Sequence, residues 1–209
     1  MTELIIETLK TLYPEAVCAL NFEHDWQLLV ACRLSAQCTD KRVNLVTPVL
    51  FERYPTLQSL ADGDVNEIGE IIKPCGLYKT KAESIKAAAQ RLISDFGGKV
   101  PDTMEQLLTL PGVGRKSANL LLGDIYGKPS YVVDTHCIRI SRRLGLTTET
   151  DPEKIERDLR KIIPPEESGA FCHRIVLFGR DFCKAKKPDC ENCPLIGKIN
   201  TGEILCTKE

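Results

Sequence analysis

The sequence predicts an all-α fold, and three observations support this prediction. Apolar residues recur at three- and four-residue spacing along most of the 209-residue chain. Aspartates and glycines stand at the ends of these periodic stretches, where they typically cap helices. Only the segment 131–133 is strand-like, and three residues do not make a sheet.

Short polar turns separate the periodic stretches, so each stretch can be assigned as a helix in chain order. The longest, 80–96, places Ile85 and Leu92 on one apolar stripe and ends at Gly97. The expected N-cap residues are Asp102, Asp134 and Asp151. The predicted helices span residues 2–12, 26–36, 40–53, 57–61, 65–73, 80–96, 103–109, 115–126, 135–144, 152–163 and 167–181.

The composition excludes several classes of protein. Lys and Arg number 28 against 29 Asp and Glu, and apolar residues make up 43%, which is typical of a globular chain. No apolar run approaches the roughly 18 residues that a membrane span needs. Acidic residues interrupt the apolar N-terminal stretch, which predicts an amphipathic helix and not a signal peptide.

Opposite charges nearly cancel, with a net charge of −1, yet they are sorted along the chain. Bases outnumber acids in 73–99, 111–145 and 180–187, whereas acids gather in 52–70 and 149–167. Such sorting could present one basic face to a polyanion, or it could reflect ordinary solvated helix faces. Charge alone does not separate these two interpretations.

A glycine-rich turn, Leu110-Pro-Gly-Val-Gly114, joins two of the predicted helices. Its glycines allow a sharp turn and a close approach, while Val113 can point inward. The amides of Gly112, Val113 and Gly114 lead into a helix N-terminus, which suits a phosphate. A plain corner between helices is the alternative. The full string resembles the helix–hairpin–helix motif, which grips the DNA backbone without reading its sequence.

Lys116 lies in the first turn after this hairpin, beside Arg115. A cation is unfavourable at a helix N-terminus, so the position favours the neutral amine, which is a nucleophile. The alternative is a phosphate contact like that expected of Arg115.

Asp134 follows the apolar segment 131–133 and begins the predicted helix 135–144. At an N-cap, backbone N–H groups keep a carboxylate ionised. Asp134 is therefore either an anion of an active site or only a helix cap.

Ten cysteines are the anomaly of the composition. Without an export signal we expect a reducing compartment and no disulfides. We expect six of them to be small buried apolar residues, namely Cys18, Cys32, Cys38, Cys75, Cys137 and Cys172. The other four suggest a metal site, because four thiolates can bind a [4Fe–4S] cluster or a zinc ion. They are Cys183, Cys190, Cys193 and Cys206.

Several motifs in a fixed order make the chain resemble the endonuclease III family of DNA glycosylases, from about residue 20 to the C-terminal cysteines. The strongest match is LPGVGRKSAN at 110–119, followed by Val-Asp-Thr-His at 133–136. Shorter matches are Leu-Ser-Ala-Gln at 34–37, Thr39-Asp40, Gly-Leu-Tyr at 76–78 and Lys81-Ala82.

The resemblance implies a bifunctional DNA glycosylase and AP lyase of base excision repair that removes oxidised or damaged pyrimidines from duplex DNA. Lys116 would attack the sugar C1′, expel the base and form a Schiff base, and β-elimination would then break the strand 3′ of the abasic site. Asp134 would stabilise the cationic sugar or help to activate the lysine. The related adenine and thymine mismatch glycosylases lack this lysine.

The resemblance also implies which residues contact DNA. Gln37 and Leu77 occupy the wedge positions that fill the gap left by the extruded nucleotide. Buried residues at helix ends are the alternative for both. The other implied contacts are Gly112, Val113, Gly114, Arg115, His136 and Lys187, of which His136 could equally be structural.

Four cysteines hold a [4Fe–4S] cluster in the family, and the first three spacings match. Where the family usually has its last cysteine, this chain has Ile199. The longer loop to Cys206 adds only about 0.8 kcal/mol of closure entropy, so we expect Cys206 to be the fourth ligand. Zinc, another fourth ligand or no metal are the alternatives. The loop 184–189 would present lysines to the DNA backbone.

By resemblance we expect two domains. One spans about 20–128, with six helices and the hairpin, and the other combines 1–19 with 129–209 and the cluster. Double-stranded DNA with damaged pyrimidines or abasic sites would lie between them, with Lys116 and Asp134 facing each other. We expect a monomer without membrane contact, cytoplasmic and nucleoid-associated if prokaryotic.

Two other functions remain open from the sequence. One is a glycosylase of the same fold with a shifted base preference, for example for pyrimidine photoproducts or mismatched bases. The other is a non-catalytic DNA-binding module that uses the hairpin and a zinc knuckle.

Overall fold

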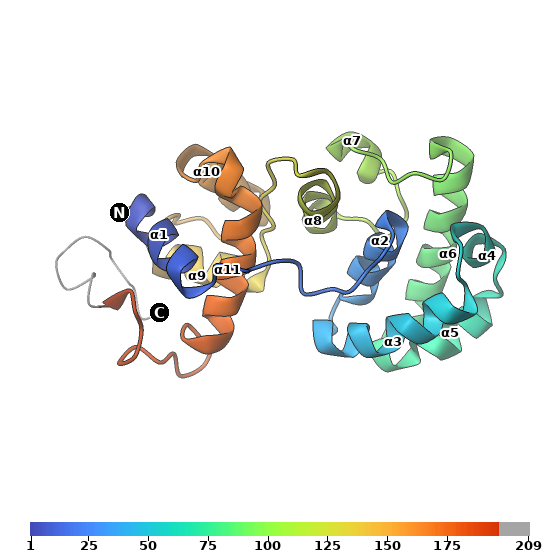
Figure 1. Ribbon diagram of the computed structural model, residues 1–209, viewed down its shortest axis with the longest axis horizontal. Coiled ribbons are helices and arrows are strands. Elements are labelled where there is room, and N and C mark those ends of the chain that lie inside the picture. Colours follow the sequence, from blue (N-terminus) through green and yellow to red (C-terminus); the bar gives the residue numbers. More distant parts are fainter. Residues whose placement is uncertain (197–209) are drawn as a thin grey trace. The chain divides into compact units, whose positions relative to one another are not determined.

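The computed structural model describes residues 1–196, which form helices joined by turns and contain no strand (Figure 1). The prediction of an all-α fold is confirmed. The chain divides into two compact units, one of residues 18–126 and one that combines 1–17 with the chain from 127 onward. No helix among the described residues is long and apolar enough to cross a membrane.

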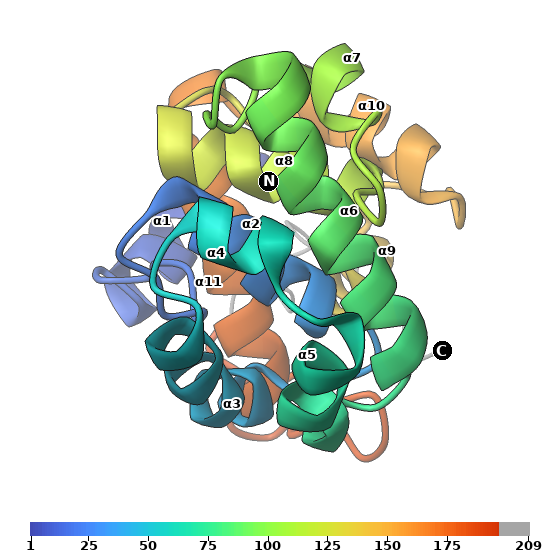
Figure 2. The same ribbon diagram turned by 90° about the vertical axis from the view of Figure 1, so that its right-hand side faces the viewer.

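The unit 18–126 is organised around a long helix, α6. This helix packs against both α4 and α5, which cover one of its sides (Figure 2). The elements are α2 (Asp25–Leu34), α3 (Asp40–Arg53), α4 (Leu57–Asp62), α5 (Val65–Ile72), the 3₁₀ turn η1 (Lys73–Cys75), α6 (Tyr78–Phe96), α7 (Met104–Leu107) and α8 (Arg115–Tyr126).

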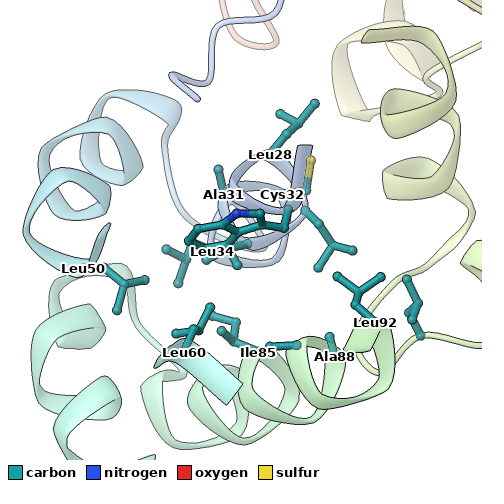
Figure 3. Close-up of a cluster of buried hydrophobic side chains, with 14 of the residues drawn as sticks. Leu28, Ala31, Cys32, Leu34, Leu50, Leu60, Ile85, Ala88 and Leu92 are labelled. Atoms are coloured by element: carbon teal, nitrogen blue, oxygen red, sulfur yellow. The ribbon is translucent and has the colours of Figure 1, made fainter. Parts of the chain in front are cut away.

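The core of this unit lies between α2 and the helices around it (Figure 3). Leu28 and Leu34 of α2 belong to one buried cluster with Leu50, Leu60 and Ile85, and each of these five side chains is at most 1% exposed. Burying one such side chain contributes about 1.5–3 kcal/mol. The core therefore fixes α2 and α6, whose ends carry the two wedge candidates.

The second unit consists of helices packed on α11. Both α1 and α9 contact α11 (Figure 1). At Gly179 the approach is close, because a Cβ added there would lie 2.5 Å from Nδ1 of His136. The elements are α1 (Thr2–Leu12), α9 (Thr135–Arg143), α10 (Pro152–Ile162), the 3₁₀ turn η2 (Pro165–Glu167) and α11 (Ser168–Asp181).

Every predicted helix is present, with each end within two residues of its predicted place. Asp134 and Asp151 cap their helices as predicted, since they accept the amides of Cys137 and Lys154. The expectation for Asp102 is wrong. The hydroxyl of Thr103 accepts the Gln106 amide, so α7 begins one residue later.

The scattered cysteines are less uniform than predicted. Four of the six are buried, whereas Cys18 and Cys38 are only partly buried. Both partly buried residues lie in loops, outside α2 and α3. The apolar neighbours of these two residues in the sequence therefore did not imply full burial.

Candidate DNA interface and active site

The glycine turn joins α7 to α8 within the unit 18–126. The Val113 amide donates to the Leu110 carbonyl oxygen at 3.1 Å, and Val113 packs, partly buried, against the core. The Ala118 amide donates to the Gly114 carbonyl oxygen at 2.9 Å as α8 begins. We expected three successive amides to be available to a phosphate. The turn itself uses the Val113 amide, so only the amides of Gly112 and Gly114 remain as candidate phosphate donors.

The two glycines of the hairpin have different surroundings. Gly112 has a φ of +78°, and a Cβ there would lie 2.6 Å from Nε of Arg33. That nitrogen donates to Oγ of Ser84 at 2.7 Å, so Gly112 lets the hairpin pack against α2 and α6. At Gly114 a Cβ would meet no heavy atom of the described residues within 4 Å. The space beside Gly114 is therefore open to a binding partner.

Lys116 is exposed at the second residue of α8. Burial raises the pKa of the Cys32 thiol on α2, and the positive charge of Lys116 acts in the opposite direction. The amine of Lys116 therefore stands at the surface of this unit, directly after the hairpin.

A buried lysine holds together the loops that carry Gln37 and Leu77. Lys81 is 0% exposed, and its Nζ donates to the carbonyl oxygens of Leu34 and Cys75, each at 2.8 Å. Leu34 ends α2 and Cys75 ends η1, so the ammonium joins the two loops. Burial lowers the pKa of Lys81, and the two carbonyl oxygens satisfy its donors.

Three of the predicted DNA contacts have an unusual backbone. Gln37, Leu77 and Lys187 have φ values of +55°, +49° and +54°, and no other non-glycine residue within 1–196 has a positive φ. Such conformations cost about 1–3 kcal/mol and cluster at functional sites. Gln37 and Leu77 are both exposed, Leu77 by 57%, so the alternative that they are buried helix-end residues is wrong.

Asp134 begins α9 in the second unit. Its Oδ1 accepts the Cys137 amide at 2.7 Å, which fixes the carboxylate at the helix N-terminus. Two residues further on, Nδ1 of His136 lies 3.2 Å from Nη2 of Arg139. His136 also lies close to Gly179 on α11.

Two arginines of α9 hold the first residues of the cysteine segment, which the sequence did not predict. Arg139 donates from Nη2 to the Cys183 carbonyl oxygen at 2.9 Å. Arg143, 8% exposed, donates to Sγ of Cys183 at 3.4 Å and to the Lys184 carbonyl oxygen at 2.9 Å. Both counted toward the basic stretch 111–145, and the structure turns both toward protein atoms. Their four-residue spacing places both on one face of the helix, but nothing in the sequence indicates the segment that they bind.

The cysteine segment has the chemistry of an iron–sulfur site. Burial raises the pKa of Cys193, the backbone amides of Leu195 and Ile196 oppose the rise, and the charges of Cys183 and Cys190 add to it. The three sulfurs are therefore neighbours, and amide and guanidinium donors stabilise their thiolates. Cys206 lies outside the described residues.

Cys183, Cys190 and Cys193 supply three thiols within one short segment, and the Arg143 guanidinium donates to the sulfur of Cys183. Thiolates are the ligands that iron–sulfur clusters take, and hydrogen bonds to the sulfurs tune them. The residues present fit an iron–sulfur cluster.

Comparisons with known proteins identify the family. A model described as HhH-GPD superfamily base excision DNA repair protein matches residues 30–165, and one for the iron-sulfur binding domain of endonuclease III matches 183–197. The endonuclease III of Synechocystis sp. is 51% identical over 93% of this chain and 89% of its own length. The chain belongs to the endonuclease III family. The endonuclease III of Bacillus subtilis is 38% identical over 96% of this chain and 92% of its own.

Solved structures agree with this membership. A non-covalent endonuclease III–DNA complex is similar with a TM-score of 0.89 and 38% identity, over 97% of this chain and 99% of that one. A trapped endonuclease III–DNA covalent intermediate is similar with the same TM-score and identity, over 96% of this chain and 99% of that one. A thermostable thymine-DNA glycosylase, 22% identical with a TM-score of 0.82, shares the fold.

Membership in the endonuclease III family establishes the class of enzyme. The chain is a DNA glycosylase with AP lyase activity in base excision repair, and it carries an iron–sulfur cluster. The predictions of family, enzyme class and [4Fe–4S] cofactor are confirmed. The roles of individual residues stay predictions.

Proposed function

We propose that this endonuclease III family member removes oxidised or damaged pyrimidines from duplex DNA and cleaves 3′ of the abasic site through a Schiff base on Lys116. The place of Lys116 carries the proposal. Its amine is exposed on the second residue of α8, directly after a hairpin with open space beside Gly114. A DNA backbone seated on the hairpin would bring a sugar carbon close to this amine.

The proposed reaction needs one amine and one fixed anion. The Lys116 nitrogen attacks C1′, and the bond from C1′ to the base breaks. The sugar ring then opens to a protonated Schiff base. Loss of a proton from C2′ expels the 3′ phosphate by β-elimination.

We assign the fixed anion to Asp134. Positive charge develops at C1′ as the base leaves, and a carboxylate that is already in place stabilises it without reorganisation. The bond from the Cys137 amide holds Asp134 in this way.

We assign Gln37 and Leu77 to the gap that an extruded nucleotide leaves in the duplex. C1′ cannot be attacked inside the base stack, so the damaged nucleotide must first leave it. Both side chains are exposed on strained backbone, as expected for residues held ready to enter DNA.

The DNA backbone would be held from both units. In the unit 18–126 the proposed DNA contacts are the hairpin residues 112–115. In the other unit they are His136 and Lys187. Beside α9, a hollow of about 420 Å³ is lined by Thr135, Arg142 and Thr148 among others, and the exposed Arg142 suits a phosphate. We propose that the protein binds damaged DNA as a monomer, in the cytoplasm and at the nucleoid of a prokaryote.

We assign Cys183, Cys190, Cys193 and Cys206 as the ligands of the cluster. When bound, the cluster supplies four thiolate–iron bonds that close the segment after α11. The reaction needs only an amine and a carboxylate, so the cluster shapes the segment that carries Lys187.

Borohydride trapping tests the mechanism. Purified protein is incubated with a duplex that contains one thymine glycol, and borohydride reduces any Schiff base to a stable amine. We expect a covalent protein–DNA band for the wild type and for Arg115→Ala, which keeps the nucleophile but loses a neighbouring cation. We expect no band for Lys116→Ala.

The other outcomes separate the remaining functions. A band on an abasic duplex but not on thymine glycol would indicate a shifted base preference. No band on either duplex would overturn the lyase mechanism on Lys116.

A further inference from the structure

Lys81 belongs to one of the ordered motifs of the sequence, yet the proposed reaction gives it no role. Its side chain is 0% exposed, although a lysine is almost never fully buried without polar partners. Nζ donates to the carbonyl oxygens of Leu34 and Cys75, each at 2.8 Å. A variant without this nitrogen would take a strong donor away from two buried oxygens at once.

The two bonded carbonyl groups stand shortly before the two exposed residues with strained backbone. Leu34 precedes Gln37 by three residues, and Cys75 precedes Leu77 by two. A non-glycine residue keeps a positive φ only where the surrounding structure enforces it. Lys81 also binds Leu77 itself, since its amide donates to the Leu77 carbonyl oxygen at 3.0 Å. One residue therefore holds the loop of Leu77 at two points and joins it to the loop of Gln37.

The same stretch of α6 also reaches the hairpin. Ser84 donates from Oγ to the Lys81 carbonyl oxygen at 3.0 Å. The same Oγ accepts Nε of Arg33 at 2.7 Å, and Arg33 lies against Gly112. Both loops and the hairpin are therefore anchored to neighbouring residues of α6, within the unit 18–126.

We propose that Lys81 is a positioning residue for extrusion of the damaged nucleotide. This role rests on the proposed function, because it assumes that Gln37 and Leu77 enter the duplex while the hairpin holds its backbone. A loop that becomes ordered only on entering DNA loses conformational entropy at that step. Lys81 removes this cost, because it orders both loops in the free protein. It is fully buried and acts only through them.

Hydrogen exchange of the free holoprotein tests the support of the loops without any activity. Lys81→Met keeps the apolar stem of the side chain and removes its donors. The amides of Cys38 and Gly76 each close a turn within one of the two loops, at 3.1 Å. We expect both amides to exchange about tenfold faster in this variant.

A matched variant separates this effect from a general loss of stability. Leu92→Ala opens a cavity in the core about three turns further along α6, where Leu92 is 1% exposed. Unchanged exchange of Cys38 and Gly76 in Lys81→Met, or an equal rise in Leu92→Ala, would overturn the proposal. If Lys81→Met does not fold, Lys81→Gln, which keeps N–H donors on a shorter side chain, is measured with the same expected direction.

Excision kinetics test the consequence for extrusion. One thymine glycol is placed either opposite adenine in a paired duplex or within a bubble of mismatched pairs, where it is already unstacked. We expect Lys81→Met to lower the ratio of the paired rate to the bubble rate about tenfold in single turnovers, because extrusion limits mainly the paired lesion. Leu77→Ala should lower the same ratio. Leu92→Ala should leave it unchanged, because lost stability lowers both rates equally.

The outcomes separate this inference from the proposed function. An unchanged ratio in Lys81→Met beside a lowered ratio in Leu77→Ala would overturn the role of Lys81 in extrusion. An unchanged ratio in Leu77→Ala would instead count against the wedge assignment of the proposed function. If the wild type excised thymine glycol from neither DNA, the proposed substrate would be wrong, and the exchange of the Cys38 and Gly76 amides would decide on Lys81 alone.

Discussion

At the scale of single residues, the two hairpin glycines have different roles: Gly112 allows close packing within the protein, whereas Gly114 leaves space for a ligand. Gly112 has no room for a Cβ because Arg33 and Ser84 lie against it, and its φ is positive. Gly114 has room in the described structure. Adding a methyl group at Gly112 should therefore have a different effect from adding one at Gly114.

Gly112→Ala should lower the free energy of unfolding by about 1–3 kcal/mol, because the methyl group displaces Arg33 and the left-handed backbone disfavours alanine. Gly114→Ala should leave stability within about 0.5 kcal/mol and weaken DNA binding, because the methyl group fills the space of a phosphate. Urea titration and binding of an abasic duplex distinguish the two. Equal effects of both substitutions on stability would contradict the difference in packing.

At the scale of elements, α9 joins the candidate active site to the cysteine segment. Asp134 stands at its start, and Arg139 and Arg143 bind the segment from its middle and end. A change in the arginines therefore acts on the cluster without touching its cysteines.

Arg143→Gln should speed loss of iron to a chelator by about tenfold, because charged hydrogen bonds to Cys183 and Lys184 are lost. Decay of the visible absorbance of the cluster measures this rate. Arg142→Gln is the matched control, because Arg142 is the exposed neighbour on the same helix. A similar rate in both variants would show that Arg143 does not hold the segment.

The contact of α1 with α11 depends on a partly buried carboxylate. Bonds from Lys10 at 2.6 Å and Arg174 at 3.0 Å lower the pKa of Glu167 below its usual 4.5, and burial opposes them. The unfolded state therefore binds this proton more readily. The stabilisation is complete above pH 4.5 and is lost as the pH falls through the lowered folded pKa.

Glu167→Gln should cost about 1–2 kcal/mol at neutral pH and make unfolding less dependent on pH below about 4.5. Denaturant titrations at several pH values measure both effects. Glu166→Gln, at an exposed neighbour, should change neither. If the free energy of unfolding of Glu167→Gln fell below pH 4.5 as steeply as that of the wild type, Glu167 would not have this role.

At the scale of the whole molecule, a chain with a net charge of −1 has to bind a polyanion. On the proposed function, the basic stretches of the sorted charge hold the DNA, although Arg139 and Arg143 are directed toward protein atoms. The lysines after α11 are exposed, with Lys187 on strained backbone. We therefore expect binding to depend strongly on salt.

The slope of log affinity against log salt concentration should be negative, and Lys187→Ala should make it shallower by about 1. Titrations of one duplex at several salt concentrations measure the slope. Lys161→Ala, which removes an exposed lysine paired with Asp158 on α10, is the control and should leave it unchanged. An unchanged slope in Lys187→Ala would remove this residue from the interface.

Local patterns in the sequence determined much of this protein. Helix periodicity, the glycine turn and the Asp134 cap depend on residues within a few positions of one another, so they were predictable. The ordered motifs also determined the family and the cofactor. The cap of α7 was misplaced by one residue because an aspartate and a threonine, both good caps, stand side by side.

Only the tertiary structure decided which side chains face inward. Lys81 binds Leu34 across 47 residues of sequence, and Arg143 binds Lys184 across 41. No local pattern predicts such partners, because a charged side chain on a helix is usually solvated. Lys81 and Arg143 are buried and hold backbone segments together. A buried ammonium or guanidinium group needs carbonyl oxygens in place of the water molecules that it loses.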